Sequence, residues 1–287
     1  CERRQQASAP PSVPEVVAVT VQTQKAVLTT ELPGRTAPYL VAEIRPQVNG
    51  LIQKRLFTEG SDVQAGQVLY QIDPAPFQAA LDSAQAALGR SQANLPSIQS
   101  RVGRYKDLLA DRAVSQQDYD DAASALNQVE ADVQYWKAAV ETARINLAYT
   151  RVTAPISGRV GRSSVTDGAL VTAYQPVALA TIQQLDPIYV DVPQSTATLL
   201  RLKRRMEDGR LSQDVANEKK VELVLDDGTK YPSAGTLQFR DVTVDPTTGS
   251  VIVRAVFANA EGVLLPNMFV RAVVKEGVNE QAILIPQ

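Results

Sequence analysis

The sequence predicts an elongated multidomain protein of mixed α and β class. A small β-sandwich is split by a long antiparallel α-helical coiled-coil hairpin, and a small β-barrel with one helix follows. Three observations predict this fold. A strand pattern occurs twice, two heptad patterns fill the interval between its occurrences, and short alternating segments make up the last third of the chain.

The repeated strand pattern is an apolar–Gly–apolar segment followed by a turn and a second strand. It occupies residues 48–72 and returns at residues 156–182. Each occurrence is too short to bury a face by itself, so the two must close on each other as halves of one domain. We therefore expect Asp73 and Arg151 to lie close together. The chain between them must leave this domain and return to it.

The segment between the halves carries apolar or small residues in alternating steps of four and three, which is the heptad pattern of a coiled coil. The first series is Phe77, Leu81, Ala84, Leu88, Ser91, Leu95, Ile98, Val102, Tyr105 and Leu109, and the second is Tyr119, Ala122, Leu126, Val129, Val133, Trp136, Val140, Ala143 and Leu147. A short break at 110–114 joins the two helices, so they are antiparallel. Ser115 and Asp118 form a capping-box pattern that starts the second helix. Pro96 removes an amide donor inside the first helix, which predicts a kink there.

Short alternating strands separated by turn signals predict the β-barrel. The predicted strands are 27–41, 185–192, 221–225, 235–239, 251–257 and 268–274, with an amphipathic helix from Ser195 to about Asp208. A strand at 16–21 has no obvious partner, and residues 282–287 have the pattern of a strand that is cut short. We therefore expect a further segment after Gln287.

The composition excludes several classes of function. A net charge of −2 predicts no nucleic-acid partner. The chain has no histidine, which is the commonest general base and metal ligand, and its only cysteine is Cys1. A disulfide framework, a zinc cluster and an iron–sulfur site are therefore excluded, and we expect no catalytic residue, cofactor or metal ligand. No apolar run in the sequence is long enough to cross a membrane.

The position of Cys1 predicts a lipid attachment site. A chain that begins with cysteine in place of methionine has the form of a processed bacterial lipoprotein, in which acyl chains are carried by that residue. Residues 2–15 are polar and contain three prolines, so we expect a disordered tether there. Stable anchoring needs more than one acyl chain. The alternative is a cloning scar or an arbitrary boundary of the cloned segment.

Several longer motifs point to one family. They are Glu31-Leu32-Pro33-Gly34-Arg35, Arg45-Pro46-Gln47-Val48-Asn49-Gly50, Ala154-Pro155-Ile156-Ser157-Gly158-Arg159-Val160-Gly161, Gln184-Leu185-Asp186-Pro187-Ile188-Tyr189-Val190 and Leu265-Pro266-Asn267-Met268-Phe269-Val270-Arg271. By these motifs the chain resembles the periplasmic adaptors, or membrane fusion proteins, of tripartite multidrug efflux pumps of the resistance–nodulation–division (RND) type. The resemblance covers nearly all of the chain after the tether.

The resemblance implies a lipoyl-like domain that carries the hairpin, a β-barrel and a membrane-proximal domain. The implied division is a lipid-anchored tether (1–15), N-terminal strands of the membrane-proximal and β-barrel domains (16–41), the first lipoyl-like half (42–73), the α-helical hairpin (74–150), the second lipoyl-like half (151–183), the β-barrel (184–277) and the start of an incomplete membrane-proximal domain (278–287).

The resemblance also implies a function without catalysis. Adaptors of this family link an inner-membrane RND proton/drug antiporter to a TolC-like outer-membrane channel, and associate as hexamers in the pump. They are periplasmic lipoproteins anchored to the inner membrane of Gram-negative bacteria. The family's hairpin tip engages the channel through an Arg–Leu–Ser pattern, which Arg104, Leu108 and Ser115 match here. The alternative is that Leu108 belongs to the coiled coil and Ser115 is only a helix cap.

Two other functions stay open at the level of sequence. An adaptor of an ABC-type exporter would share this architecture. A lipoyl or biotinyl carrier would present a modified lysine at the turn between its two halves. Here the hairpin replaces that turn, and its only lysines, Lys106 and Lys137, lie on predicted helices.

Overall fold

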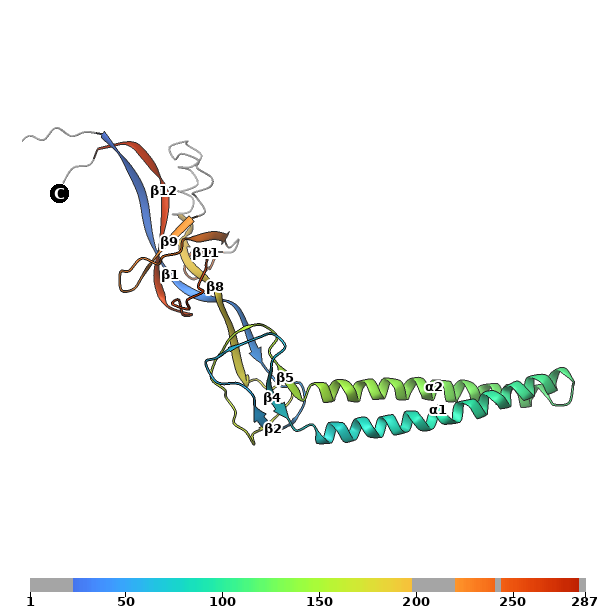
Figure 1. The fold of residues 1–287 in the computed structure, drawn as a ribbon. Coiled ribbons are helices and arrows are strands. Elements are labelled where there is room, and N and C mark those ends of the chain that lie inside the picture. The colour runs from blue at the N-terminus through green and yellow to red at the C-terminus, as the bar shows by residue number, and fades with distance from the viewer. Residues whose placement is uncertain (1–22, 198–219, 241–243, 284–287) are drawn as a thin grey trace, which may run out of the picture. The chain divides into compact units, whose positions relative to one another are not determined.

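A computed structural model of the chain describes residues 23–197, 220–240 and 244–283 (Figure 1). These residues form two compact units. The sandwich unit contains residues 36–189 and 257–268, and the barrel unit contains the described residues of 23–35, 190–256 and 269–283. Strands and helices are both present, so the mixed α and β class is confirmed.

The elements follow one another in the order that Figure 1 labels. They are β1 (Thr23–Ile44), β2 (Gly50–Arg55), β3 (Asp62–Val63), β4 (Val68–Ile72), α1 (Ala75–Ala110), α2 (Gln116–Ala148), β5 (Arg151–Thr153), β6 (Gly158–Val160), β7 (Leu170–Val171), β8 (Ala180–Ser195), β9 (Lys220–Leu225), β10 (Gly235–Arg240), β11 (Ser250–Phe257) and β12 (Phe269–Ile283).

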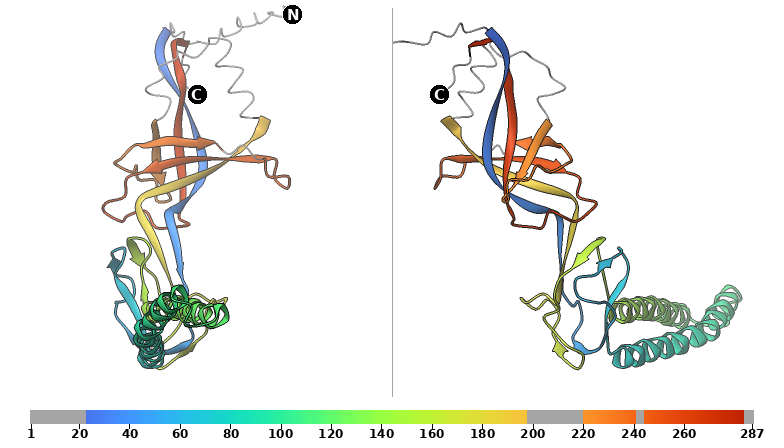
Figure 2. Two further views of the ribbon diagram at one scale, coloured as in Figure 1. Left: turned by 90° about the vertical axis from the view of Figure 1, so that its right-hand side faces the viewer. Right: turned by 60° about the vertical axis from the view of Figure 1, so that its left-hand side comes forward.

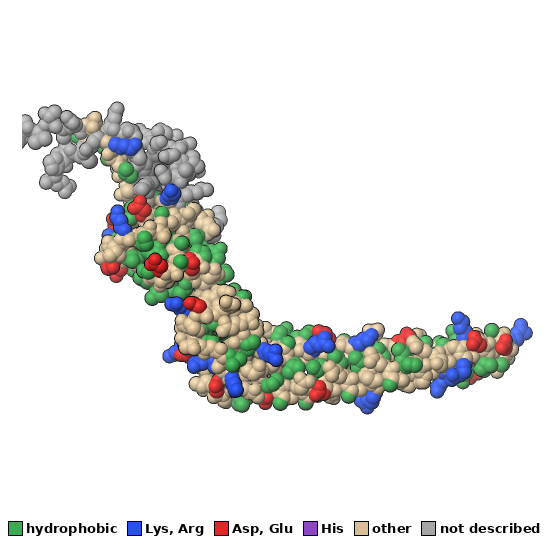
Figure 3. All heavy atoms as spheres, in the orientation of Figure 1, with side chains coloured by type: hydrophobic (Ala, Val, Ile, Leu, Met, Phe, Trp, Pro, Cys, Tyr) green, Lys and Arg blue, Asp and Glu red, His purple; other side chains and the backbone are tan. Residues whose placement is uncertain are grey.

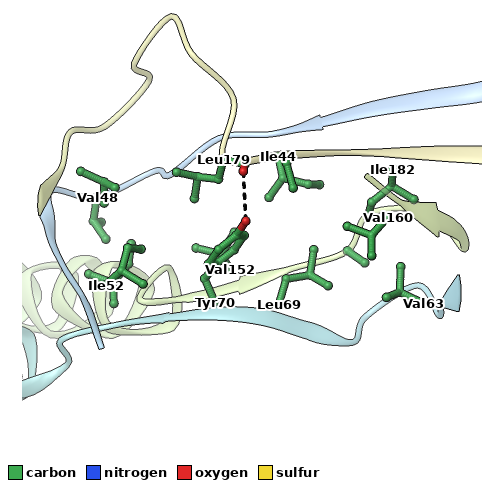
Figure 4. Close-up of a cluster of buried hydrophobic side chains, with 14 residues drawn as sticks. Ile44, Val48, Ile52, Val63, Leu69, Tyr70, Val152, Val160, Leu179 and Ile182 are labelled. Carbon is green, nitrogen blue, oxygen red and sulfur yellow. Dashed lines mark hydrogen bonds between the residues drawn. The ribbon is translucent and has the colours of Figure 1, made fainter. Parts of the chain in front are cut away.

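The two halves of the repeated pattern close on each other in the sandwich unit, as predicted. One sheet has the order β5-β4-β2-β7, and β3 pairs with β6, which pairs with β8. The buried core draws on both halves, and Figure 4 shows these side chains pointing toward one another. The core residues are Ile44, Val48, Ile52, Val63, Leu69, Tyr70 and Ile72 from the first half, and Val152, Ala154, Val160, Val171, Leu179, Ala180 and Ile182 from the second.

The helical insertion leaves and re-enters the sandwich unit at neighbouring strands. Arg151 of β5 lies directly opposite Gln71 of β4. The amide of Ile72 donates to the carbonyl oxygen of Thr150 at 2.8 Å. Asp73 follows Gln71 by two residues, so it lies near Arg151 as the sequence predicts.

The inserted segment forms two long helices, α1 of 36 residues and α2 of 33 residues. All residues of the two predicted heptad series are buried or half-buried, and most of the other helical positions are exposed. Val133, at the middle of the second series, is only 5% exposed. The predicted seam between the helices is confirmed. Helix α1 continues through Pro96, and the predicted kink stays a prediction.

The strands predicted for the β-barrel are all present, although those predicted at 27–41 and 185–192 fall within β1 and β8, which have residues in both units. Strands β12, β9, β10, β11 and β8 follow β1 in one hydrogen-bonded order. Figures 1 and 2 show β1 and β12 side by side, and their antiparallel register runs from Thr23↔Ile283 to Arg35↔Phe269. The buried residues of the barrel unit include Val221, Leu223 and Val270.

Some predictions fall on residues that the structure does not describe. These are Cys1, the tether, the strand at 16–21 and residues 284–287. The predicted helix from Ser195 to Asp208 is described only at its start, where residues 196–197 are helical. Among the described helices, none combines the length and the apolar character that a membrane span requires.

Candidate functional site: the tip of the hairpin

The end of α1 is closed by backbone hydrogen bonds. The amide of Ala113 donates to the carbonyl oxygen of Leu108 at 2.8 Å, and the amide of Arg112 donates to that of Leu109 at 3.0 Å. This pair of bonds is a Schellman motif, which requires a left-handed residue directly after the helix cap. Arg112 takes that position with φ 57°. Glycine is the usual residue there because it has no Cβ to clash, so Arg112 holds a strained conformation at the tip.

The start of α2 is fixed by the capping box that the sequence predicts. The hydroxyl of Ser115 accepts from the amide of Asp118 at 3.2 Å, and the amide of Ser115 donates to the Asp118 carboxylate at 3.1 Å. The same hydroxyl donates to Oδ2 of Asp118 at 2.6 Å. Hydrogen bonds from the hydroxyl and then the amide of Ser115 hold the pKa of Asp118 below its usual range. Ser115 therefore has a structural role, and it remains exposed.

The three residues of the proposed docking pattern lie at this end of the hairpin. Arg104 is exposed, and Leu108 is 42% exposed although it is a large apolar residue. The buried seam passes through Tyr105 and Leu109, so Leu108 lies off it. Arg104 and Leu108 are one turn apart and share a face of α1. Ser115 follows the turn that joins the helices.

The tip carries charges of both signs, which Figure 3 shows gathered at the end of the hairpin. The cations are Arg101, Arg104, Lys106 and Arg112, and the anions are Asp107, Asp111, Asp118, Asp120 and Asp121. In the part of the chain that the structure describes, Arg104 forms no ion pair or hydrogen bond with another residue. Its guanidinium is therefore available to a carboxylate or a backbone carbonyl of a partner.

The geometry of the tip suits recognition of a partner. Within the described ranges, no group of three or more His, Cys, Asp or Glu side chains could hold a metal ion. The exposed groups at the tip are a guanidinium, an apolar side chain and a hydroxyl that lie within a few turns of one another. Groups of these kinds serve recognition by hydrogen bonding and apolar contact.

Comparison with known proteins decides the family. The model of the RND membrane fusion protein barrel-sandwich hybrid domain matches residues 40–183, and the model of the β-barrel domain of the same proteins matches residues 187–278. The chain belongs to the RND membrane fusion proteins. The inserted hairpin lies inside the range of the first model, so it is part of what defines this membrane fusion protein.

Curated relatives support the assignment along the whole chain. The chain is 54% identical to the multidrug efflux pump subunit AcrA of Escherichia coli strain K12 over 287 residues, which is all of this chain and 72% of AcrA. It is 55% identical to the multidrug resistance protein MexA of Pseudomonas aeruginosa over 284 residues, which cover 99% of this chain and 70% of MexA.

Solved structures share the fold of this membrane fusion protein. A MacA–MexA chimeric protein that contains the Pseudomonas aeruginosa MexA α-hairpin domain matches with a TM-score of 0.62 at 28% identity, over 93% of this chain and 87% of the chimera. MacA of Actinobacillus actinomycetemcomitans matches with a TM-score of 0.64 at 20% identity, over 94% of this chain and 85% of MacA. The second match bears on the fold alone.

The backbone conformation of one tip residue, Arg112, was not predicted from the sequence. Arg112 is a further cation of the tip, besides Arg101, Arg104 and Lys106, and its backbone is left-handed in the turn. The usual signal for this position is glycine or asparagine after the last helical turn. Because arginine occupies it here, the sequence carried no local sign of the motif.

Proposed function

We propose that this chain is the periplasmic adaptor subunit of a tripartite drug efflux pump. It links an inner-membrane RND proton/drug antiporter to a TolC-like outer-membrane channel and catalyses no reaction itself. The observation that carries this proposal is the identity of more than half of all residues to multidrug adaptors, from the first residue to the last and through the hairpin. An adaptor of an ABC-type exporter is disfavoured because both matching domain models are of RND adaptors.

The channel docks at the hairpin tip in this proposal. Arg104 presents a planar, permanently charged donor that pairs with a carboxylate or carbonyl of the channel. Leu108 adds apolar area next to it, and Ser115 positions the start of the return helix. The support is that Arg104 and Leu108 are exposed, lie one turn apart and are not required by the buried seam. Helix capping by Ser115 is compatible with a second role in docking.

The remaining expectations belong to the same proposal. The sandwich unit is a lipoyl-like domain whose connecting turn has become the hairpin, and residues 278–287 begin a membrane-proximal domain. Acyl chains on Cys1 anchor the chain to the inner membrane, with residues 1–15 as the tether. Copies of the chain associate side by side, as a hexamer in the assembled pump. A lipoyl or biotinyl carrier is disfavoured because Lys106 and Lys137 lie on helices and not at an exposed turn.

The test reverses the charge at the tip. Arg104→Asp is expected to abolish crosslinking of the adaptor to the outer-membrane channel in cells and to restore drug susceptibility. Arg90→Asp is the matched control, because Arg90 is also an exposed arginine of α1 but lies about four turns before Arg104, at about 3.6 residues per turn. Unchanged crosslinking and full resistance in Arg104→Asp would refute the tip as the docking site.

A further inference from the structure

The two edges of the hairpin carry different surfaces, and one of them is a row of glutamines. Gln78, Gln85, Gln92 and Gln99 recur every seven residues along α1, and each directly follows a residue of the buried seam. All four are exposed. The row belongs to a short sequence repeat, which reads Gln-Ala-Ala-Leu at 78–81 and again at 85–88. We call this side of the hairpin the glutamine edge.

The opposite edge contains an open groove of about 460 Å³ near the base of the hairpin. Residues of both helices line it, among them Phe77, Ala80, Ala84, Tyr135, Ala139 and Thr142. Tyr135 is 65% exposed, and its ring stands nearly perpendicular to the Trp136 ring, with the ring centroids 5.1 Å apart. The lining is apolar except for a few hydroxyl and amide groups.

The contacts at the base establish that the two surfaces lie on different sides of the seam. Gln78 lines a separate cavity together with Arg144 of α2 and strand residues of the sandwich unit. Ala80 lines the groove and does not line that cavity. Side chains two residues apart on a helix point to different sides, which agrees with this division.

The groove lining contains no charged residue, and the glutamine row has few charges beside it on α1, although Arg144 of α2 lies next to Gln78 and the Gln78 amide donates to Asp82 at 2.8 Å. The positions that flank a solvated coiled-coil seam are commonly Glu and Lys. Between Ser83 and Ser100 of α1, Arg90 is the one charged residue. The cores of protein interfaces are depleted in charged residues and enriched in aromatic ones, as at Phe77 and Tyr135. These two edges therefore have the composition of surfaces that become covered.

We propose that the groove of one copy receives the glutamine edge of a second copy, with the two hairpins parallel and side by side. The self-association in the proposed function is the basis of this inference, which adds the two surfaces that meet. Gln78 and Gln85 occupy the same two turns of α1 as Ala80 and Ala84, so parallel copies bring edge and groove together without an axial shift. The long amide side chains can fill an alanine-lined groove and bond to the Thr142 hydroxyl.

The contact that results is heterologous, because each copy offers a different surface to each of its neighbours. A heterologous contact continues from copy to copy and closes into a ring when the rotation between copies allows it. A self-complementary contact between two like edges would stop at a dimer. The two arrangements therefore predict different pairs of neighbouring residues.

Disulfide trapping in cells tests which residues meet. The background is Cys1→Ser, which leaves no other cysteine in the chain. One copy carries Gln85→Cys and a second, differently tagged copy carries Thr142→Cys, and both are produced with the transporter and the channel in the oxidising periplasm. We expect a band at the mass of two chains, containing both tags, that is lost on reduction. Neither variant alone forms it.

The matched control replaces Thr142→Cys with Glu141→Cys, because Glu141 is its neighbour on α2, is exposed and does not line the groove. No disulfide is expected with Gln85→Cys. A second pair, Gln92→Cys with Tyr135→Cys, tests the contact one heptad closer to the tip. The inference is overturned if both expected pairs stay unlinked, or if Gln85→Cys alone links to itself.

Drug efflux measured in the same cells separates the two proposals. A mixed disulfide in cells that lack efflux supports the pairing of the edges and counts against the proposed function. Active efflux with no disulfide at either pair supports the proposed function and overturns the pairing of the edges.

Discussion

The hydroxyl of Tyr70 donates to the carbonyl oxygen of Leu179 at 3.0 Å and lies 2.7 Å from the hydroxyl of Ser163. Tyr70 precedes the hairpin in the chain, and its two partners follow it. The Tyr70 side chain is fully buried, and Figure 4 shows its bond to Leu179 inside the core. One polar contact therefore ties the two halves of the sandwich together across the insertion.

Tyr70→Phe is expected to lower the free energy of unfolding of the sandwich unit by about 1 kcal/mol, the usual net value of one hydrogen bond. The loss stays small because the Leu179 carbonyl also accepts from the amide of Ser164 at 2.8 Å. Urea denaturation followed by far-UV circular dichroism measures the difference. Tyr174→Phe, at a tyrosine that is 75% exposed, is the control and should leave the midpoint unchanged.

The burial of Tyr70 also predicts that the stability of the folded state depends on pH in the alkaline range. Burial raises the pKa of Tyr70 above its usual value of 10.0. The folded state therefore favours the neutral phenol, and its contribution to stability is complete below pH 10 and is lost as the pH rises through the folded-state pKa. The difference in stability between wild type and Tyr70→Phe should shrink above pH 10. A difference that grows with pH would contradict the assignment.

Replacement of glycine by alanine is expected to change stability in opposite directions at Gly158 and at Gly89. A Cβ at Gly158 would lie 2.5 Å from the carbonyl oxygen of Gln183, so Gly158→Ala must displace backbone between β6 and β8. We expect a loss of about 1–3 kcal/mol. A Cβ at Gly89 in α1 meets nothing within 4 Å. Gly89→Ala should therefore stabilise the helix, by up to about 1 kcal/mol. Thermal unfolding of the two variants provides the comparison.

Val133 offers a test of the hairpin seam. Val133→Lys places a charge at a position that is 5% exposed, where burial of an unpaired charge is strongly unfavourable. Faster hydrogen exchange of the amides of α1 and α2 is the expected result. Ala131→Lys, two residues earlier at an exposed position, should leave exchange unchanged. Equal protection in both variants would mean that Val133 does not face α1.

The capping box at Ser115 predicts a titration that NMR can follow. Ser115→Ala removes the hydroxyl that holds the pKa of Asp118 down, so that pKa should rise toward its usual value. In the wild type the ionised carboxylate supports the cap above the unfolded-state pKa, and this support is lost as the pH falls through the folded-state pKa. Amides at the start of α2 should exchange faster in the variant at neutral pH.

Cys1→Ser tests the lipid anchor. If acyl chains are attached to Cys1, the variant should move from the membrane fraction to the soluble periplasmic fraction. Partial efflux should survive, because many weak contacts act together in an assembled ring. Mass spectrometry of the wild-type protein from native membranes gives the direct measurement, and an unmodified thiol on Cys1 would refute the anchor.

The hairpin could be predicted closely because its signal repeats. Nineteen seam residues follow one period, and every one is buried or half-buried in the structure. The start of α2 was also predictable, since Ser115 and Asp118 are a local capping pattern. The length of β1 was not. The pattern predicted a strand at 27–41, whereas β1 extends from Thr23 to Ile44. Its residues from Thr23 to Arg35 pair with β12 far along the chain, and β1 also pairs with β8.

Features of the candidate site that depend on tertiary structure were harder to predict. The left-handed Arg112 breaks the rule that glycine follows a helix cap, so its place in the Schellman motif appears only in the backbone hydrogen bonds. The groove beside Tyr135 combines residues of α1 and α2 and needs the register between them. The glutamine row can be read from the sequence, but the heptad pattern was identified from apolar residues and glutamine is polar.

The insertion of the hairpin between β4 and β5 has a consequence for the history of such proteins. Because these strands are hydrogen-bonded neighbours, the two attachment points are about 5 Å apart across one ladder. Two packed antiparallel helices have axes about 8–10 Å apart. The connecting residues 73–74 and 149–150 bridge this difference, so the hairpin can be transplanted as a cassette while the sandwich stays intact. The MacA–MexA chimera with its MexA hairpin is an instance of such a graft. With the docking at the tip that we propose, recombination at these two points would let an adaptor change its channel in one step, without redesign of its core.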